Sequence, residues 1–175
     1  MRPIQRSPVV EMRLRVAMIC TGNICRSPMA EVVLQHFVDA DSSLRGFVNV
    51  TSAGTANWHV GSPMDLRARG ALDRAGFGGA GSLAAYADRA YLDRQDFVIG
   101  MTREHVHEVK KRLSNPSTEV ILLRNLTEPG RELDLFDPYY GDDAEFDECL
   151  EMVRAGGQRL TWEFRKRLGG GSSDP

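Results

Sequence analysis

Cysteine, basic charge and long apolar runs are all scarce in this sequence of 175 residues. Three cysteines are too few, and odd in number, for a secreted domain held together by disulfides. The 22 Lys and Arg residues are outnumbered by 24 Asp and Glu residues, so we expect no basic surface that would neutralise the phosphates of a nucleic acid. Charged residues interrupt every apolar stretch before it reaches the ~20 residues of a membrane-spanning helix. Neither a nucleic acid nor a membrane is therefore an expected partner.

A targeting segment and internal repeats are also missing. The sequence does not open with a charged segment followed by an apolar stretch, as a secretory signal does, so we expect a cytoplasmic protein whose cysteines stay reduced. The length suits one domain with a core of its own. Composition predicts a single domain at residues 13–168, with a flexible extension at residues 1–12 and a flexible tail at residues 169–175.

The apolar residues follow strand and helix periods in turn. Short runs of apolar and β-branched residues predict four strands, at residues 14–19, 47–52, 96–101 and 119–123. Helical spacing predicts helices between and after them, at residues 28–39, 65–75 and 102–113 and along a final stripe from Phe146 to Phe164. Gly156 and Gly157 are expected to weaken the middle of that last helix. This alternation predicts an α/β fold with a mostly parallel sheet covered on both faces.

The loop after the first predicted strand carries the strongest chemical signal. Five residues separate Cys20 from Arg26, namely Thr21, Gly22, Asn23, Ile24 and Cys25. Ser27 is expected to cap the helix that follows, with Pro28 at its first position. The backbone N–H groups of such a loop, together with the helix N-terminus, form a nest for an anion of the size of phosphate. Gly22 and Asn23 tolerate the positive φ angles that a tight loop requires.

Cys20 and Arg26 have complementary properties in this setting. The helix end and the guanidinium both favour the thiolate form of Cys20, which is the nucleophilic form. Arg26 has a planar fork that grips two phosphoryl oxygens at once, which Lys cannot do. A buried structural cysteine that happens to precede an arginine is the alternative interpretation. Neither a Gly-Lys-Ser/Thr loop nor a Gly-x-Gly-x-x-Gly motif is present, so nucleotide binding has no motif support.

Residues 20–31, Cys-Thr-Gly-Asn-Ile-Cys-Arg-Ser-Pro-Met-Ala-Glu, resemble the signature of low-molecular-weight protein tyrosine phosphatases of the bacterial type. Residues 51–61, 101–105 and 137–140 resemble three further segments of that family, the last being its Asp-Pro acid loop. The resemblance covers about residues 14–168. It implies a single-domain, three-layer fold with a four-stranded parallel sheet flanked by helices and a phosphate-binding loop after the first strand. It also implies that the protein needs neither a metal nor an organic cofactor.

The resemblance further implies that the protein hydrolyses phosphotyrosine through a phosphocysteine at Cys20. Asp137 is then the general acid for the leaving oxygen, and afterwards the base that activates water. A simple turn at Asp137-Pro138 is the alternative. Ser27 is expected to donate to the Cys20 thiolate, and Asn23 to support the loop.

Three aromatic residues flank these groups. In the family such residues wall the cleft for the phosphotyrosine ring, so Trp58, Tyr139 and Tyr140 are expected to do so here. A deep slot would favour phosphotyrosine over the shorter phosphoserine and phosphothreonine. An ordinary core position is the alternative for Trp58.

The sequence departs from the family at the segment Ser82-Leu83-Ala84-Ala85. Relatives usually carry a His there that bonds the Asn and Ser of the phosphate loop. None of the four His residues of this chain lies at that position, so a less rigid loop and reduced activity are expected. His105 and His107, two residues apart on a predicted helix, face different directions and do not suit a metal pair.

Two rival functions share parts of these patterns. Arsenate reductases of similar fold use further cysteines in a disulfide cascade, but no cysteine pair occurs between residues 80 and 95. A phosphoprotein-binding module with an inactive loop would be expected to lose Cys20, Arg26 or Asp137, and all three are present. The expected partners are phosphotyrosine-containing proteins and a tyrosine kinase, and export without a signal peptide stays open. Cys25 is also close enough in sequence to Cys20 for a reversible inhibitory disulfide, which we keep as a hypothesis.

Overall fold

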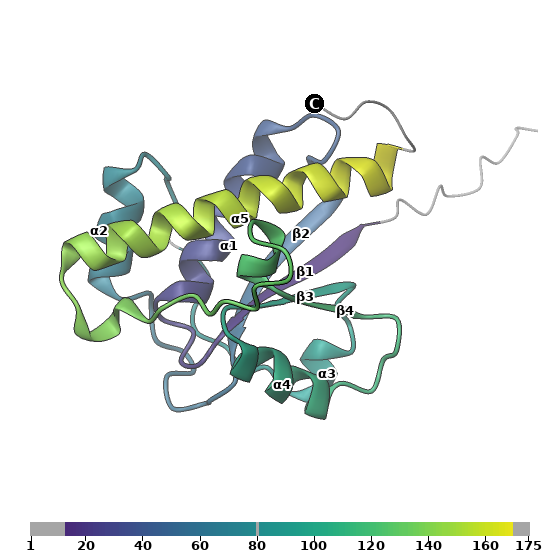
Figure 1. The fold of residues 1–175 in the computed structure, drawn as a ribbon, viewed down its shortest axis with the longest axis horizontal. Coiled ribbons are helices and arrows are strands. Elements are labelled where there is room, and N and C mark those ends of the chain that lie inside the picture. The colour runs from purple at the N-terminus through teal and green to yellow at the C-terminus, as the bar shows by residue number, and fades with distance from the viewer. Residues whose placement is uncertain (1–12, 80, 170–175) are drawn as a thin grey trace, which may run out of the picture.

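A computed structural model describes residues 13–79 and 81–169 of the chain (Figure 1). Its four strands form one sheet in the order β2-β1-β3-β4, and every neighbouring pair is parallel. The strands are β1 (Leu14–Cys20), β2 (Val48–Gly54), β3 (Phe97–Gly100) and β4 (Glu119–Leu122). The predicted four-stranded parallel sheet is therefore confirmed. The flexible segments expected at residues 1–12 and 170–175 lie outside the described residues.

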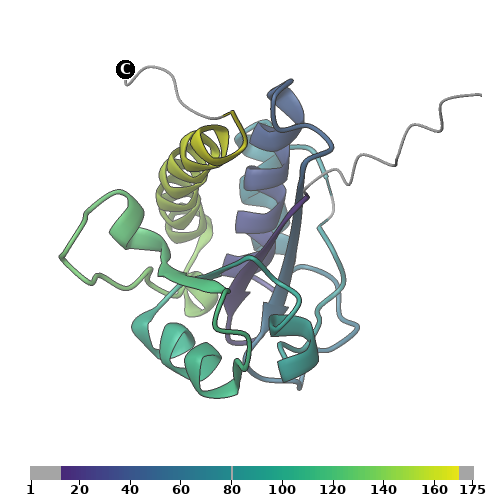
Figure 2. The same cartoon turned by 90° about the vertical axis from the view of Figure 1, so that its right-hand side faces the viewer.

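Helices cover both faces of the sheet, as Figures 1 and 2 show. One face packs against α1 (Arg26–Ala40), α2 (Leu66–Arg74) and α5 (Asp143–Gly169). The other face is covered by α3 (Arg89–Leu92) and α4 (Arg103–Arg112). The four-residue α3 is too short to leave a periodic signal, and the sequence did not predict it. No helix in the described ranges is long and apolar enough to cross a membrane.

The central strand β1 shows why its sequence is apolar almost throughout. Val16 and Met18 belong to the core under α1 and α5, whereas Ala17 and Ile19 belong to the core under α3 and α4. Successive side chains of a strand point to opposite faces, so a strand covered on both sides needs a continuous apolar run. Chain connections leave β1 in one direction and β3 in the other, which opens a crevice at their carboxyl ends. Cys20, the last residue of β1, lies at that crevice.

The final helix α5 is unbroken from Asp143 to Gly169, despite the two glycines in its middle. A Cβ on Gly156 would lie 2.6 Å from Leu123, and one on Gly157 would lie 3.4 Å from the Phe37 ring. The glycines therefore let α5 approach its neighbours closely and do not divide it. Gly169 ends the helix, so the tail expected from residue 169 begins at least one residue later.

Candidate active site

The loop from Cys20 to Arg26 joins β1 directly to α1, as the sequence predicts. Asn23 has a φ of 57°, the left-handed conformation expected of it. Gly22 is not in that conformation, and a Cβ there would lie 2.9 Å from the His59 ring. The loop therefore requires glycine at position 22 because a larger side chain would collide with His59, and not because of its φ angle. The loop curls back on the nucleophile, because the Asn23 N–H points to the Cys20 Sγ at 3.3 Å.

The start of α1 differs from the expectation. The helix begins at Arg26, its N-cap residue is Cys25, and no side chain caps it. Ser27 is therefore not the cap, and Pro28 is the third helical residue and not the first. The Ser27 hydroxyl instead contacts Cys20 and Asn23. A helix N-terminus without a side-chain cap keeps its N–H groups available to an anion bound in the loop.

Hydrogen bonds orient the Ser27 hydroxyl toward the nucleophile. The Asn23 Nδ2 group donates to Ser27 Oγ at 2.9 Å and to Ser52 Oγ at 2.8 Å. Ser27 Oγ lies 2.9 Å from the Cys20 Sγ. When Cys20 is a thiolate, the Ser27 hydroxyl must be the donor of this hydrogen bond, because a thiolate can only accept. A hydroxyl donor at that distance stabilises a thiolate. The donation from Ser27 to a Cys20 thiolate and the support of the loop by Asn23 stay predictions, and this geometry is compatible with both.

Two hydroxyls and a carboxylate support the loop at the place where the family resemblance implies a His. Ser52 donates to one oxygen of the buried Glu31 carboxylate, and Ser82 donates to the other at 2.5 Å. The Ala85 N–H donates to Asn23 Oδ1 at 2.8 Å. Asn23 thus has both amide hydrogens and its oxygen engaged, so the loop is supported without an imidazole on this side. Sequence reasoning missed Glu31, Ser52 and Ser82 as loop supports, because they lie far apart in the chain.

Residues after β2 hold the other side of the loop. The Thr55 and Ala56 N–H groups donate to the Cys20 and Thr21 carbonyls at 2.9 and 3.0 Å. A Cβ on Gly54 would lie 2.5 Å from the Thr21 carbonyl oxygen, so only glycine permits this approach. The resemblance of residues 51–61 to the family therefore has a physical reason.

His105 reaches the loop from α4 and was also missed. The Thr102 N–H donates to its Nδ1 at 3.1 Å, so Nε2 carries the hydrogen and donates to Thr21 Oγ1 at 2.9 Å. Burial, and then the charge of Arg26, lowers the pKa of His105 to about 4. His107 is exposed, so the two imidazoles do face different directions. His105 is a neutral brace of the phosphate loop.

Acidification is expected to destabilise the protein through His105. Its pKa is lower in the folded state than the unfolded value of 6.5, so its contribution is complete above pH 6.5 and is lost as pH falls toward 4. Between pH 7 and pH 5 the free energy of unfolding should fall by about 2 kcal/mol from this group alone. Urea unfolding at both pH values, compared with His105→Gln, measures this. An equal loss in the variant would contradict the assignment.

Arg26 and Asp137 meet across the crevice. The Arg26 Nη2 lies 2.6 Å from Asp137 Oδ2, and the Tyr139 N–H donates to Asp137 Oδ1 at 3.2 Å. The Arg26 side chain is 6% exposed, whereas that of Asp137 is 47% exposed. The guanidinium is therefore fixed in the interior, and the carboxylate can exchange protons with solvent. The structure brings together the three residues predicted as catalytic, although they lie up to 117 positions apart.

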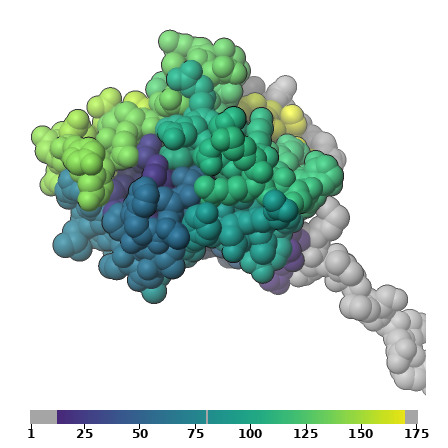
Figure 3. Space-filling model, turned by 90° about the horizontal axis from the view of Figure 1, so that it is seen from below, coloured from purple at the N-terminus to yellow at the C-terminus, as the bar shows by residue number. Residues whose placement is uncertain are grey.

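A cavity of about 270 Å³ opens above Cys20. In Figure 3 the purple loop residues lie at the base of a hollow between the blue segment near residue 60 and the light-green segment near residue 140. Trp58, His59, Tyr139 and Tyr140 line the cavity together with loop residues. Trp58 is 71% exposed, so the alternative interpretation, in which Trp58 is an ordinary core aromatic, is wrong. His59 was not among the predicted cleft residues.

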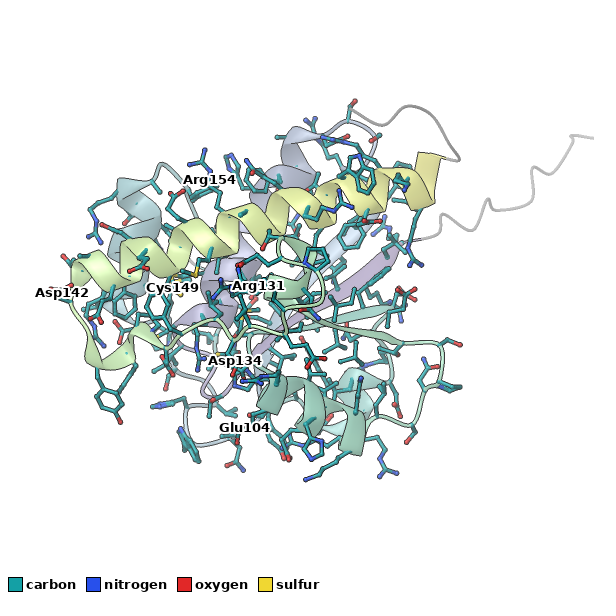
Figure 4. The ribbon with its side chains drawn as sticks, viewed as in Figure 1. Glu104, Arg131, Asp134, Asp142, Cys149 and Arg154 are labelled. Atoms are coloured by element: carbon teal, nitrogen blue, oxygen red, sulfur yellow. The ribbon has the colours of Figure 1, made fainter. Side chains whose placement is uncertain are left out.

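The other two cysteines, Cys25 and Cys149, are buried and are not joined in a disulfide within the described part of the chain. Burial, and then the charge of Asp65, raises the pKa of the Cys25 thiol, so Cys25 is a poor nucleophile. Burial raises the pKa of Cys149 to about 12. Cys149 lies on the inner side of α5 (Figure 4) and belongs to the core, as predicted. The disulfide between Cys20 and Cys25 stays a hypothesis.

Comparison with known proteins gives concordant matches. The profile of the family described as low molecular weight phosphotyrosine protein phosphatase matches residues 15–169. A low molecular weight protein-tyrosine-phosphatase of Streptomyces coelicolor is 37% identical over 163 residues, 91% of this chain and 98% of the relative. The low molecular weight protein-tyrosine phosphatase A of Mycobacterium tuberculosis is 38% identical over 144 residues, 81% of this chain and 86% of the relative. The crystal structure of YfkJ from Bacillus subtilis superposes with a TM-score of 0.78 at 29% identity, covering 89% of this chain and 96% of that one.

Proposed function

This chain belongs to the low molecular weight phosphotyrosine protein phosphatase family, and from that premise we propose how its residues hydrolyse phosphotyrosine. It is a protein tyrosine phosphatase that acts through a cysteine. The observation that supports the residue assignments best is the position of Cys20 at the base of a cleft that also contains Arg26 and Asp137. The proposed steps require neither a metal nor an organic cofactor.

In the first step Cys20 forms the bond to phosphorus. The thiolate attacks in line, the bond from phosphorus to the tyrosyl oxygen breaks, and Asp137 transfers its proton to that oxygen. The N–H groups of Thr21 through Arg26 and the Arg26 guanidinium hold the three remaining phosphoryl oxygens. The products are a phosphocysteine and a free tyrosine side chain.

Binding of the phosphate is proposed to release Asp137 from Arg26. The guanidinium is paired with the Asp137 carboxylate, with Arg26 Nη2 2.6 Å from Asp137 Oδ2. A dianionic phosphoryl group in the loop competes for the same fork, because it offers two oxygens in a matching plane. Asp137, which is 47% exposed and no longer paired, then takes up the proton that the leaving oxygen requires.

In the second step water hydrolyses the phosphocysteine. Asp137, now ionised, removes a proton from the water as its oxygen attacks phosphorus. The bond between phosphorus and Cys20 Sγ breaks and the thiolate leaves with inorganic phosphate. The Ser27 hydroxyl, 2.9 Å from the sulfur, stabilises this thiolate as it departs.

The substrates are phosphotyrosine-containing proteins, as membership of the family implies. A tyrosine kinase must make the modification that the enzyme removes, and we propose one as its functional counterpart. A reducing cytoplasm would keep Cys20 in the active thiol form. Trp58 and Tyr139 are proposed to stack on the phosphotyrosine ring, since both line the cavity and remain solvent-accessible.

A comparison of phosphopeptides tests this function. A phosphotyrosine peptide should be hydrolysed with a kcat/KM at least about 100-fold above that of the matched phosphoserine peptide, because two lost ring contacts and a shorter reach both penalise serine. Phosphate release under reducing conditions measures both rates. Trp58→Ala should lower kcat/KM for the phosphotyrosine peptide about tenfold. Similar rates on the two peptides in the wild-type enzyme would contradict the proposed selectivity.

A further inference from the structure

The Arg67 side chain spans the space between α2 and the segment that carries Asp137. Its Nη1 donates to the Tyr139 carbonyl at 2.8 Å and to the Gly141 carbonyl at 3.2 Å. The guanidinium carbon lies 5.5 Å from the centre of the Tyr139 ring and 4.8 Å from that of the Phe146 ring. One side chain therefore fixes both the backbone and an aromatic ring immediately after Asp137.

Asp65 holds Arg67 in place from the opposite side. Arg67 Nε donates to Asp65 Oδ1 at 3.1 Å and Nη2 donates to Oδ2 at 2.8 Å, a bidentate pair. The same carboxylate caps α2 by accepting from the Arg67 N–H. These hydrogen bonds from Arg67 hold the pKa of Asp65 below its usual range, so the pair stays ionised. Arg67 thus has little freedom to turn away.

Asp65 is in turn bonded to the phosphate loop. Its backbone N–H donates to the Ile24 carbonyl at 2.8 Å. Two residues, Asp65 and Arg67, therefore connect the loop that contains the nucleophile to the segment that contains the acid. We call this pair the Asp65–Arg67 bracket. The planar fork of arginine is needed, because it faces a carboxylate on one edge and two carbonyls on another.

The acid segment needs such a brace. Apart from the three-residue 3-10 helix at Pro138–Tyr140, residues 127–142 form no regular helix or strand. Within the described residues, the Asp137 carboxylate accepts hydrogen bonds from Arg26 and from the Tyr139 N–H, and a bound phosphate would replace the one from Arg26. The bracket binds the Tyr139 carbonyl. The N–H of the same residue would still donate to Asp137 after a phosphate had displaced Asp137 from Arg26.

We propose that Arg67 is a positioning residue for catalysis, which sets the distance between the Asp137 carboxyl and the leaving oxygen of a phosphate held in the loop. This proposal depends on the role of Asp137 under Proposed function. A displacement of about 1 Å in a proton donor can cost on the order of 100-fold in rate. Arg67 touches neither the phosphate nor the nucleophile, so its effect should appear only where the acid is needed.

Leaving-group dependence separates this role from a merely structural one. Phenyl phosphate requires protonation of its strongly basic leaving oxygen, whereas 2,4-dinitrophenyl phosphate does not. For Arg67→Ala, and more mildly for Arg67→Lys, kcat/KM for phenyl phosphate should fall about 10- to 100-fold, and that for 2,4-dinitrophenyl phosphate should stay within about twofold. In an Asp137→Asn background, Arg67→Ala should cause no further loss.

Arg74→Ala is the matched control. Arg74 lies on the same helix, but its ion pairs go to α5, to Asp147 at 2.7 Å and to Asp143 at 3.5 Å, and not to the segment at residues 137–141. It should change thermal stability without any leaving-group effect. Equal losses on both substrates for Arg67→Lys, or a further loss in the Asp137→Asn background, would overturn the proposal. If the single variant Asp137→Asn keeps the wild-type kcat/KM for phenyl phosphate, the assignment of Asp137 as the acid fails as well. If Asp137→Asn loses activity on phenyl phosphate but Arg67→Ala and Arg67→Lys do not, only the role of the Asp65–Arg67 bracket is refuted.

Discussion

Replacing Cys20 with Ser is expected to lower kcat for p-nitrophenyl phosphate by at least about 10⁴-fold, the largest effect of any single change. A serine hydroxyl is almost wholly protonated at neutral pH, and the two groups that face position 20 most closely cannot act as its base. Asn23 and Ser27, which face the sulfur at 3.3 and 2.9 Å, are hydrogen-bond donors and cannot remove a proton. Hydrolysis under reducing conditions, followed at 405 nm, is the measurement.

Two further observations make the Cys20 test specific. Cys149→Ala should retain activity within about threefold, because Cys149 is a core residue outside the cleft. Rapid acid quenching of the wild-type enzyme with a phosphorylated substrate should trap phosphate on the peptide that contains Cys20. Phosphate on another residue, or an active Cys20→Ser enzyme, would refute the phosphocysteine mechanism.

Asp137→Asn is expected to lower kcat/KM for p-nitrophenyl phosphate about 10²- to 10³-fold, the usual range for loss of a general acid. Asn keeps the shape of the side chain and can still accept from the Tyr139 N–H, so the segment should remain in place. Steady-state rates of the wild-type enzyme and the variant under reducing conditions measure the effect. A variant with the wild-type kcat/KM would contradict the assignment of Asp137 as the general acid.

Asp134→Asn provides a control for Asp137. Asp134 lies three residues earlier in the same segment and pairs with Arg103 at 3.2 Å, beside α4 (Figure 4). It does not line the cavity, so its substitution should alter kcat/KM by less than about twofold. If both variants lose activity equally, the loss reflects disturbance of the segment, and the acid must be sought elsewhere.

Local patterns in the sequence were sufficient for the fold and for much of the site. The apolar runs and helical spacings predicted all four strands and all helices longer than four residues, because burial dictates side-chain periodicity directly. The position of Cys20 between a strand and a helix identified the phosphate loop. Asp137, Trp58, Tyr139 and Tyr140 could be assigned only through the family resemblance, since nothing local in the sequence links them to that loop.

Other features were decided by the tertiary structure alone. Ser27 was predicted to cap α1, a local role, but Cys20 and Asn23 engage its hydroxyl, and contacts across the site prevail over a local preference. Glu31, Ser52 and Ser82 take over the support that a His gives in relatives, and His105 braces the loop from the other side.

The physical reason is the range of the interactions involved. Strand and helix patterns depend on neighbours within a few positions, so the sequence of this protein by itself determined its layers and the place of its nucleophile. Hydrogen bonds such as that from Arg67 to the Tyr139 carbonyl join groups 72 positions apart, and they depend on angles and distances that only the packed chain defines. The tertiary structure therefore decided which polar groups fix the positions of the nucleophile and the acid relative to each other.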